Sequence, residues 1–201
     1  FGPTFRGYHF DTKEYVAIKK IEQCSSPLKP KGVKIKEEDF RNEIKGILKF
    51  YHPNIIQLLG LYYEGEYFYL VTEYCYNGNL KEFLQHNCVG GQLPESEAQM
   101  IFKDIIEGVK FMWKNQIIHR NLKLENILLD ISQRAKINDA AFGIKTNQGK
   151  QKLVGDVLNI SPITAPEVEK QGYGVESDVW SLGIMLYQML YGRLPFQDPT
   201  N

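Results

Sequence analysis

The stretch that decides the fold is His119-Arg120-Asn121-Leu122-Lys123-Leu124-Glu125-Asn126, which runs directly into Ile127-Leu128-Leu129. Its first eight residues are mostly polar, whereas the three apolar residues behind them are typical of a short buried strand. Asp139 follows thirteen residues after Asn126, just past a second short strand predicted at Ala135-Lys136-Ile137. The pattern therefore predicts a polar loop that leads into a pair of short strands and ends near an aspartate.

Outward from this loop, the character of the sequence changes near Asn77-Gly78-Asn79, a predicted turn. Before it, β-forming residues predict two strands within 3–21 and two within 55–74, with a helix near 36–50 between them. After it, apolar periodicity predicts a long amphipathic helix over 95–116 and a nearly all-apolar, buried helix over 179–191. Residues 140–163 show no period and are interpreted as a long loop. The chain thus divides into a strand-rich part, 1–76, and a mainly helical part, 77–201.

The composition excludes several classes of protein. The 201 residues include 24 Lys+Arg and 24 Asp+Glu, and this zero net charge argues against a dedicated nucleic-acid binder. No apolar run approaches the length of a membrane-spanning helix, and no signal-peptide pattern is present. The three cysteines, Cys24, Cys75 and Cys88, lack metal-ligand spacing and are interpreted as free thiols in a reducing compartment. We therefore expect a cytoplasmic or nuclear protein.

Several short motifs occur in a fixed order: Val16-Ala17-Ile18-Lys19, a helical Glu43, the 119–126 loop, Asp139, Ala165-Pro166-Glu167 and Asp178-Val179-Trp180-Ser181-Leu182-Gly183. Together they resemble the eukaryotic protein kinase family. Lys123, two residues past Asn121, resembles the Ser/Thr type of loop. The resemblance implies an α+β, two-lobed fold with a small antiparallel β lobe and a mainly α-helical large lobe. It also implies that both ends are cut, with Phe1 inside the glycine-rich loop and Asn201 at the start of a later helix.

The resemblance further implies a site for ATP and Mg²⁺. Lys19 would hold the α- and β-phosphates while Glu43 fixes its ammonium, and Asn126 and Asp139 would ligate Mg²⁺ through oxygen. The nucleotide-binding residues would be Gly2 of the glycine-rich loop, Ala17 and Leu128 around the purine, and Glu73 and Cys75 in the hinge after the gatekeeper Thr72. The family assigns His119 a structural role, and it assigns Asp178 the anchoring of the catalytic loop.

The sequence departs from the family where catalysis is expected. Asn121 occupies the position of the catalytic base, and a neutral amide cannot take a proton; general-base assistance is typically worth ~10²–10⁴ in rate. Asp139-Ala140-Ala141 replaces Asp-Phe-Gly, and we hypothesise that Phe142 fills the slot of the missing Phe. Before Ala165, either Ile160 or Ser161 stands where a Ser/Thr kinase carries a threonine, and neither restores the pattern.

These departures, beside the retained Lys19, Glu43, Asn126 and Asp139, predict a pseudokinase: a kinase-like module that binds ATP but transfers phosphate poorly. Such a module would act as a scaffold or allosteric partner of another protein. The alternatives are a slow Ser/Thr kinase in which Asn121 only orients the hydroxyl of a protein substrate, and a decayed product without function. No nucleic-acid partner and no membrane span are expected.

Overall fold

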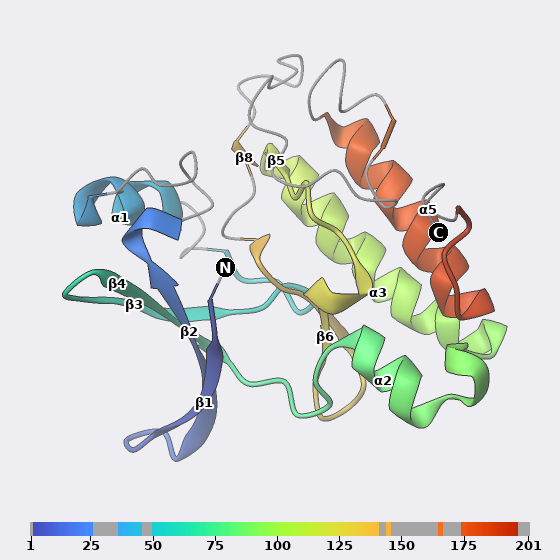
Figure 1. The fold of residues 1–201 in the computed structure, drawn as a ribbon, viewed down its shortest axis with the longest axis horizontal. Coiled ribbons are helices and arrows are strands. Elements are labelled where there is room, and N and C mark those ends of the chain that lie inside the picture. Colours follow the sequence, from blue (N-terminus) through green and yellow to red (C-terminus); the bar gives the residue numbers. More distant parts are fainter. Residues whose placement is uncertain are drawn as a thin grey trace.

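The computed structural model describes residues 2–25, 36–45, 50–140, 144–145, 165–166 and 174–196. A β-sheet with one helix lies on one side of the molecule, and the other helices lie on the opposite side (Figure 1). The elements of the first side are β1 (Thr4–His9), β2 (Glu14–Glu22), α1 (Glu37–Lys45), β3 (Leu58–Glu64) and β4 (Tyr67–Glu73). The elements of the second side are α2 (Leu80–Asn87), α3 (Glu95–Lys114), β5 (Ile117–Ile118), β6 (Ile127–Leu129), β7 (Ala135–Ile137), β8 (Ile144–Lys145) and α5 (Val175–Tyr191).

The four long strands form one antiparallel sheet in the order β1-β2-β4-β3. Gly65 closes the β3–β4 hairpin with a φ of +61°, a conformation that glycine adopts without strain. Helix α1 packs on the sheet through Phe40, whose ring stacks on that of Phe68 with centroids 4.0 Å apart. The small core of this part consists of Ile21, Phe40, Ile44, Leu58, Phe68 and Leu70. The sequence prediction of a small antiparallel β part is confirmed.

The helical part surrounds a larger core, to which α3 contributes one continuous buried stripe: Ala98, Ile101, Ile105, Val109 and Met112. This periodicity is the signal that predicted the helix, which ends at Lys114, two residues earlier than expected. Helix α3 lies along α5, as Figure 1 shows. Together with the sheet, these helices confirm the predicted α+β, two-part architecture, while the division at 76/77 stays a prediction.

Some predicted boundaries were wrong. Helix α5 begins at Val175, earlier than the predicted 179, and it is not buried all round because the side chain of Val179 is 54% exposed. Helix α2 was not predicted; its first turn is capped by Asn79, whose Oδ1 accepts a hydrogen bond from the Glu82 amide over 2.9 Å. Phe50, the last residue of the first predicted helix, is not helical, and residues 46–49 lie outside the described part.

A short segment before β3 joins the two parts through β7. The Ile56 amide donates to the Ile137 carbonyl over 2.9 Å, and the Ile137 amide donates to the Asn54 carbonyl over 2.9 Å. Gly108 of α3 permits this approach, because a Cβ at that position would lie 2.7 Å from the Asn54 carbonyl oxygen. The strand that precedes Asp139 is therefore held by both parts of the molecule.

The β6–β7 turn is tied to α3 by Asp104. Both carboxylate oxygens accept hydrogen bonds from the Arg134 guanidinium over 2.7 Å, and Oδ2 also accepts from the buried Ala135 amide over 3.2 Å. Burial alone would raise the pKa of Asp104, but the hydrogen bonds from Arg134 and Ala135 outweigh it and lower the pKa below its ordinary value. The ionised carboxylate therefore stabilises the folded state.

We expect Asp104→Ala to lower the free energy of unfolding by ~2 kcal/mol, because the buried Ala135 amide loses its acceptor. Urea denaturation at neutral pH measures this loss. The matched control is Glu107→Ala on the same helix, whose pair with Lys110 is exposed and screened by water, so its loss should be much smaller. Equal losses in the two variants would contradict the assignment.

The same carboxylate should also contribute to the pH dependence of stability. Because the pKa of Asp104 is lower in the folded state, its contribution is complete above the unfolded value of about 3.9 and is lost as the pH falls through the folded value. The stability difference between the wild type and Asp104→Ala should therefore shrink below about pH 4. Unfolding curves between pH 7 and pH 3 test this, and a difference that grows on acidification would refute it.

Candidate functional site

The 119–126 loop is anchored by the carboxylate of Asp178, a residue of α5 that is only 1% exposed. Oδ1 accepts from the Arg120 amide over 2.9 Å, and Oδ2 accepts from the His119 amide over 3.0 Å and from Trp113 Nε1 over 3.1 Å. A buried carboxylate needs such partners to offset its desolvation. Asp178 therefore has the contacts expected of an anchor, and Trp113 is an additional partner that the sequence did not predict.

His119 links the loop to the segment that carries Asp139. Its ring is buried, and Nε2 lies 2.8 Å from the carbonyl oxygen of Asn138. Nδ1 lies 3.2 Å from the amide nitrogen of Asn121, which donates to it. Both ring nitrogens are thus engaged with the backbone, which agrees with the structural role implied for His119.

Asn121 and Asn126 are connected within the loop. The side-chain amide nitrogen of Asn126 donates to the Asn121 carbonyl over 2.7 Å, and the Asn126 carbonyl accepts from the Asn138 amide over 2.8 Å. Asn126 is buried and is the last residue of the short helical turn Leu124–Asn126. The backbone amide of Asn126 closes this turn by donating to the Lys123 carbonyl. The nitrogen of the Asn126 side-chain amide is thus engaged within the loop, while the role of its oxygen as a metal ligand stays a prediction.

Asp139 forms an ion pair with Lys19 across the two parts of the molecule. The Lys19 ammonium lies 2.6 Å from Asp139 Oδ1, and the two side chains are only 16% and 8% exposed. Asp139 has a φ of +60°, which is uncommon for a residue other than glycine and is frequent at functional sites. The structure thus brings together Lys19 and Asp139, a contact that the sequence reasoning had not predicted.

The end of β4 holds the predicted hinge residues. Glu73 is its last residue, paired in register with Val16 of β2, and Thr72 is paired with Ala17. Cys75 is buried, and burial is the main cause that raises the pKa of its thiol to about 12. The thiol is therefore protonated at neutral pH and unsuited to act as a nucleophile.

The remaining predicted nucleotide-binding residues come from both parts. Ala17 lies in β2 and Leu128 in β6, and both are half-buried. Gly2 has a φ of +111°, and a Cβ there would collide with the Lys20 carbonyl, so only glycine fits this approach of the chain to β2. The nucleotide-binding roles of these three residues stay predictions.

Some predicted features lie outside the described residues. Glu43 is part of α1, but its side chain is not described, so its pairing with Lys19 stays a prediction. Phe142, Ile160 and Ser161 are not described either, so the hypothesis of a refilled slot beside His119 is untested. Ala140 is described and is buried in the large core.

Besides Trp113, two more residues of the site were missed by the sequence reasoning. Lys136 lies 3.1 Å from Glu73, and Gln57 donates its backbone amide to the same carboxylate over 2.8 Å. A signal for Lys136 exists in retrospect, because a lysine between the buried Ala135 and Ile137 of a short strand must face the opposite side. Gln57 offers no such signal, since it acts through its backbone.

The donor set can be compared with what a magnesium nucleotide requires. Mg²⁺ prefers oxygen ligands and is commonly held by one or two side chains plus phosphate oxygens. Asp139 supplies such an oxygen next to the Lys19 ammonium. Asn126 is joined through its backbone carbonyl to Asn138, the residue before Asp139, so the residue types fit that group. Within the described ranges, no group of three His, Cys, Asp or Glu side chains is placed to hold a metal by itself. Nor does any helix there have the length and apolar character needed to cross a membrane.

Comparison with known proteins identifies the arrangement. Residues 1–201 match the family described as "Protein kinase domain". The chain is 37% identical over 190 residues to a probable serine/threonine-protein kinase KIN1 homolog of Enterocytozoon bieneusi, a match that covers 94% of the chain and 30% of that relative. It is 39% identical over 164 residues to the serine/threonine protein kinase OSK3 of Oryza sativa, covering 81% of the chain and 31% of the relative.

A third relative is the serine/threonine-protein kinase SIK1 of Mus musculus, which is 36% identical over 197 residues, or 96% of the chain and 24% of the relative. The chain therefore spans less than a third of the length of these relatives. The match of the whole chain to the family, together with these relatives, shows that the protein belongs to the protein kinase domain family, with relatives of the Ser/Thr type.

Proposed function

We propose that this domain binds ATP with Mg²⁺ but transfers phosphate poorly, and that it acts as a pseudokinase on a protein partner. The observation that carries the proposal is the combination of an assembled Lys19–Asp139 pair with Asn121 at the position of the catalytic base. The first feature supports nucleotide binding, because a fixed ammonium and an oriented carboxylate are what a magnesium nucleotide needs. The second removes the group that would accept a proton.

In this proposal Lys19, Asn126 and Asp139 bind the nucleotide and its metal, and Asn121 orients the substrate. Lys19 would hold the α- and β-phosphates, while the side-chain oxygens of Asp139 and Asn126 would hold the metal. Mg²⁺, when bound, would neutralise charge on the phosphate oxygens. Asn121 can accept a hydrogen bond from a substrate hydroxyl and orient it. It cannot remove the proton at neutral pH, so the hydroxyl stays a weak nucleophile.

A slow Ser/Thr protein kinase is the second candidate, favoured by the same retained residues. Positioning and electrostatic stabilisation account for most of the catalysis of phosphoryl transfer, so a site that keeps them retains part of the rate. The two candidates differ in turnover rather than in ligand. The pseudokinase would regulate a protein partner, whereas the slow kinase would phosphorylate a protein substrate.

We expect Mg·ATP to raise the melting temperature of the wild-type domain, because a ligand that binds only the folded state stabilises it. Asp139→Asn should abolish most of the difference between ATP with Mg²⁺ and ATP with EDTA, since it removes the charged metal ligand. Lys110→Met, which breaks an exposed pair on α3, is the control and should keep the wild-type shift. A wild-type melt without any nucleotide shift would overturn the proposed ATP binding.

We expect Asn121→Asp to raise phosphate transfer to a generic protein substrate by about 10²-fold or more, because it restores a general base. Single-turnover transfer of the γ-phosphate from radiolabelled ATP measures the rate in both proteins. A wild type that already turns over at roughly 1–100 s⁻¹, as kinases do, would show that the pseudokinase assignment is wrong. An intermediate wild-type rate, raised by the substitution, would favour the slow kinase.

A further inference from the structure

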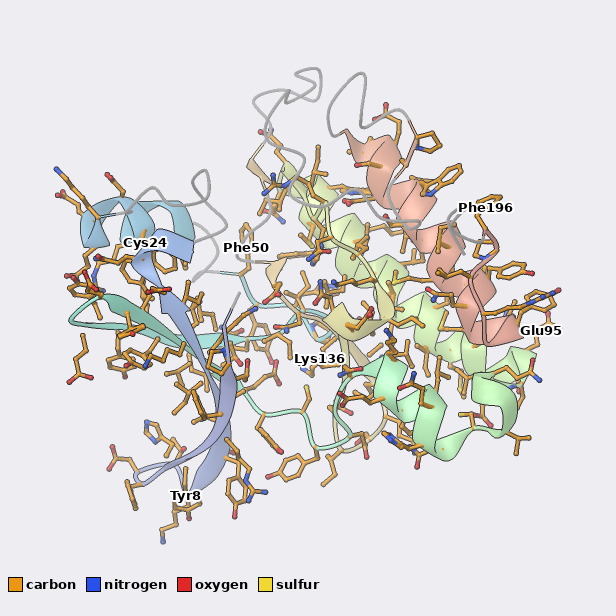
Figure 2. The ribbon with its side chains drawn as sticks, in the orientation of Figure 1. Tyr8, Cys24, Phe50, Glu95, Lys136 and Phe196 are labelled. Carbon is orange, nitrogen blue, oxygen red and sulfur yellow. The ribbon has the colours of Figure 1, made fainter. Side chains whose placement is uncertain are left out.

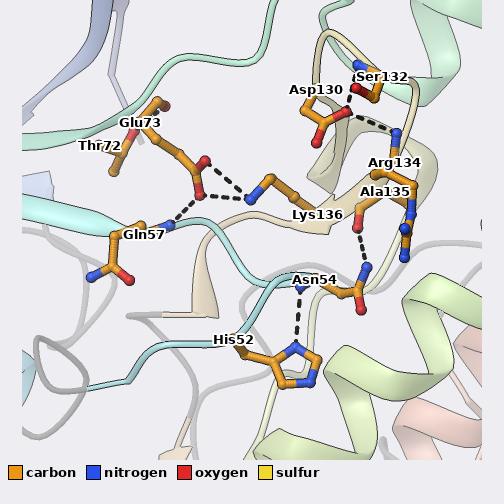
Figure 3. A network of polar contacts seen from close by, with 10 residues as sticks. All are labelled: His52, Asn54, Gln57, Thr72, Glu73, Asp130, Ser132, Arg134, Ala135 and Lys136. Carbon is orange, nitrogen blue, oxygen red and sulfur yellow. Dashed lines mark hydrogen bonds and ion pairs between the residues drawn. The ribbon is translucent and has the colours of Figure 1, made fainter.

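His52 begins the turn that precedes Asn54, and its ring takes part in that turn (Figure 3). Nδ1 accepts a hydrogen bond from the Asn54 amide over 3.1 Å, and the His52 carbonyl accepts from the Ile55 amide over 3.1 Å. A ring nitrogen that accepts a hydrogen bond carries no proton, so the proton of the neutral ring is on Nε2. The turn as it stands therefore requires the uncharged form of His52.

Asn54 connects this turn to strand β7. Its side-chain amide nitrogen donates to the Ala135 carbonyl over 3.0 Å, and its carbonyl accepts from the Ile137 amide over 2.9 Å. Asn54 is only 4% exposed, so a group that loses its partner there finds little water to replace it. Asp139 lies two residues past the end of β7. The turn therefore helps to fix the strand that precedes the proposed metal ligand.

The surroundings of the His52 ring set when it gains a proton. The ring is half-buried and packs on that of Phe111 in α3 with centroids 4.9 Å apart, and Phe111 also contacts Phe50, which lies between the sheet and the helices (Figure 2). Burial lowers the pKa of His52 below its ordinary value of about 6.5. Two charged side chains of the described elements also act on the ring: the carboxylate of Glu107 in α3 raises the pKa, and the ammonium of Lys136 in β7 lowers it. The ring is therefore neutral at pH 7 and gains a proton on acidification.

We propose that His52 is a positioning residue of the nucleotide site and that binding of a proton to its ring opposes binding of Mg·ATP. A proton on Nδ1 would place an N–H against the Asn54 amide, which would then lose its acceptor. The turn would shift, and with it the strand that leads to Asp139. Because such coupling is reciprocal, Mg·ATP should in turn weaken the binding of a proton to His52. This inference rests on the proposed nucleotide binding and adds its regulation by pH.

The test measures the dissociation constant of Mg·ATP by titration calorimetry from about pH 7.5 to about pH 5.5, a range that spans the titration of histidine. The matched comparison is His52→Asn, because an asparagine oxygen can accept from the amide two residues on but does not titrate. Protonation of ATP itself affects both proteins alike. On acidification the wild type should lose up to about fivefold more affinity than His52→Asn, which corresponds to one hydrogen bond of about 1 kcal/mol.

A second variant, His52→Phe, keeps a ring on Phe111 and removes the acceptor at every pH. It should weaken Mg·ATP about fivefold at neutral pH and should show no excess loss on acidification. The matched control is His9→Phe, because Nδ1 of His9 accepts from the Thr12 amide over 3.2 Å beside Tyr8, at the far tip of the β1–β2 hairpin (Figure 2). This control should keep the wild-type dissociation constants across the whole pH range.

The wild type also gives a reading without any substitution. The midpoint of the His52 ring titration, followed by NMR, should move to lower pH when Mg·ATP is present, because the bound state favours the neutral ring. A midpoint that stays in place would refute the proposed coupling.

A purely structural role of His52 would lower the melting temperature of His52→Phe and leave its dissociation constant for Mg·ATP unchanged, and this result would overturn the inference. If His52→Phe fails to fold, the comparison of the wild type with His52→Asn decides, and parallel pH profiles would contradict the coupling. A wild type that binds no Mg·ATP even at neutral pH would overturn the proposed function itself, which separates the two failures.

Discussion

The site depends on the buried carboxylate of Asp178. It takes three N–H donors, two from the backbone of the 119–126 loop and one from Trp113 of α3. Without them, a carboxylate that is 1% exposed would carry an uncompensated desolvation cost of several kcal/mol. These hydrogen bonds fix the backbone at the start of the 119–126 loop, where Arg120 has a φ of +67°. Later in the loop, the Asn126 side chain donates to the Asn121 carbonyl. The ring of His119 contacts the Asn138 carbonyl and so links the loop to the segment that carries Asp139.

Strand β7 connects the helical part of the molecule to the sheet. Its buried residues, Ala135 and Ile137, belong to the large core, while the residue between them, Lys136, faces the sheet and meets Glu73. Two residues past the strand, Asp139 meets Lys19 of β2. The two ion pairs lie three residues apart on one short segment that is itself paired with residues 54–56. The parts of the molecule that would hold the purine and the phosphates are therefore connected to the same strand.

Local pattern was enough to predict β1–β4, α3, β6 and β7, because alternating or periodic apolar residues reflect which face is buried. It was not enough for α2, whose main signal is the cap at Asn79, or for β5 and β8, two-residue strands that exist only because they pair with each other. The site residues likewise divide into those that a local motif indicates and those that only a tertiary contact brings together. Asn126 and Asp139 were singled out by a motif within a short stretch, and their role as metal ligands stays a prediction. The Lys19–Asp139 pair, which no motif predicted, joins residues 120 positions apart.

The sequence by itself determined the family motifs, the asparagine at position 121 and the change from predicted strands to predicted helices along the chain. These are properties of residue identity and spacing, which do not require the chain to be folded. Only the tertiary structure decided which charges meet, because Lys19 and Lys136 each find their carboxylate on the other part of the molecule. The physical reason is that an ion pair depends on distance in space, and the sheet and helices set that distance only after both cores have packed.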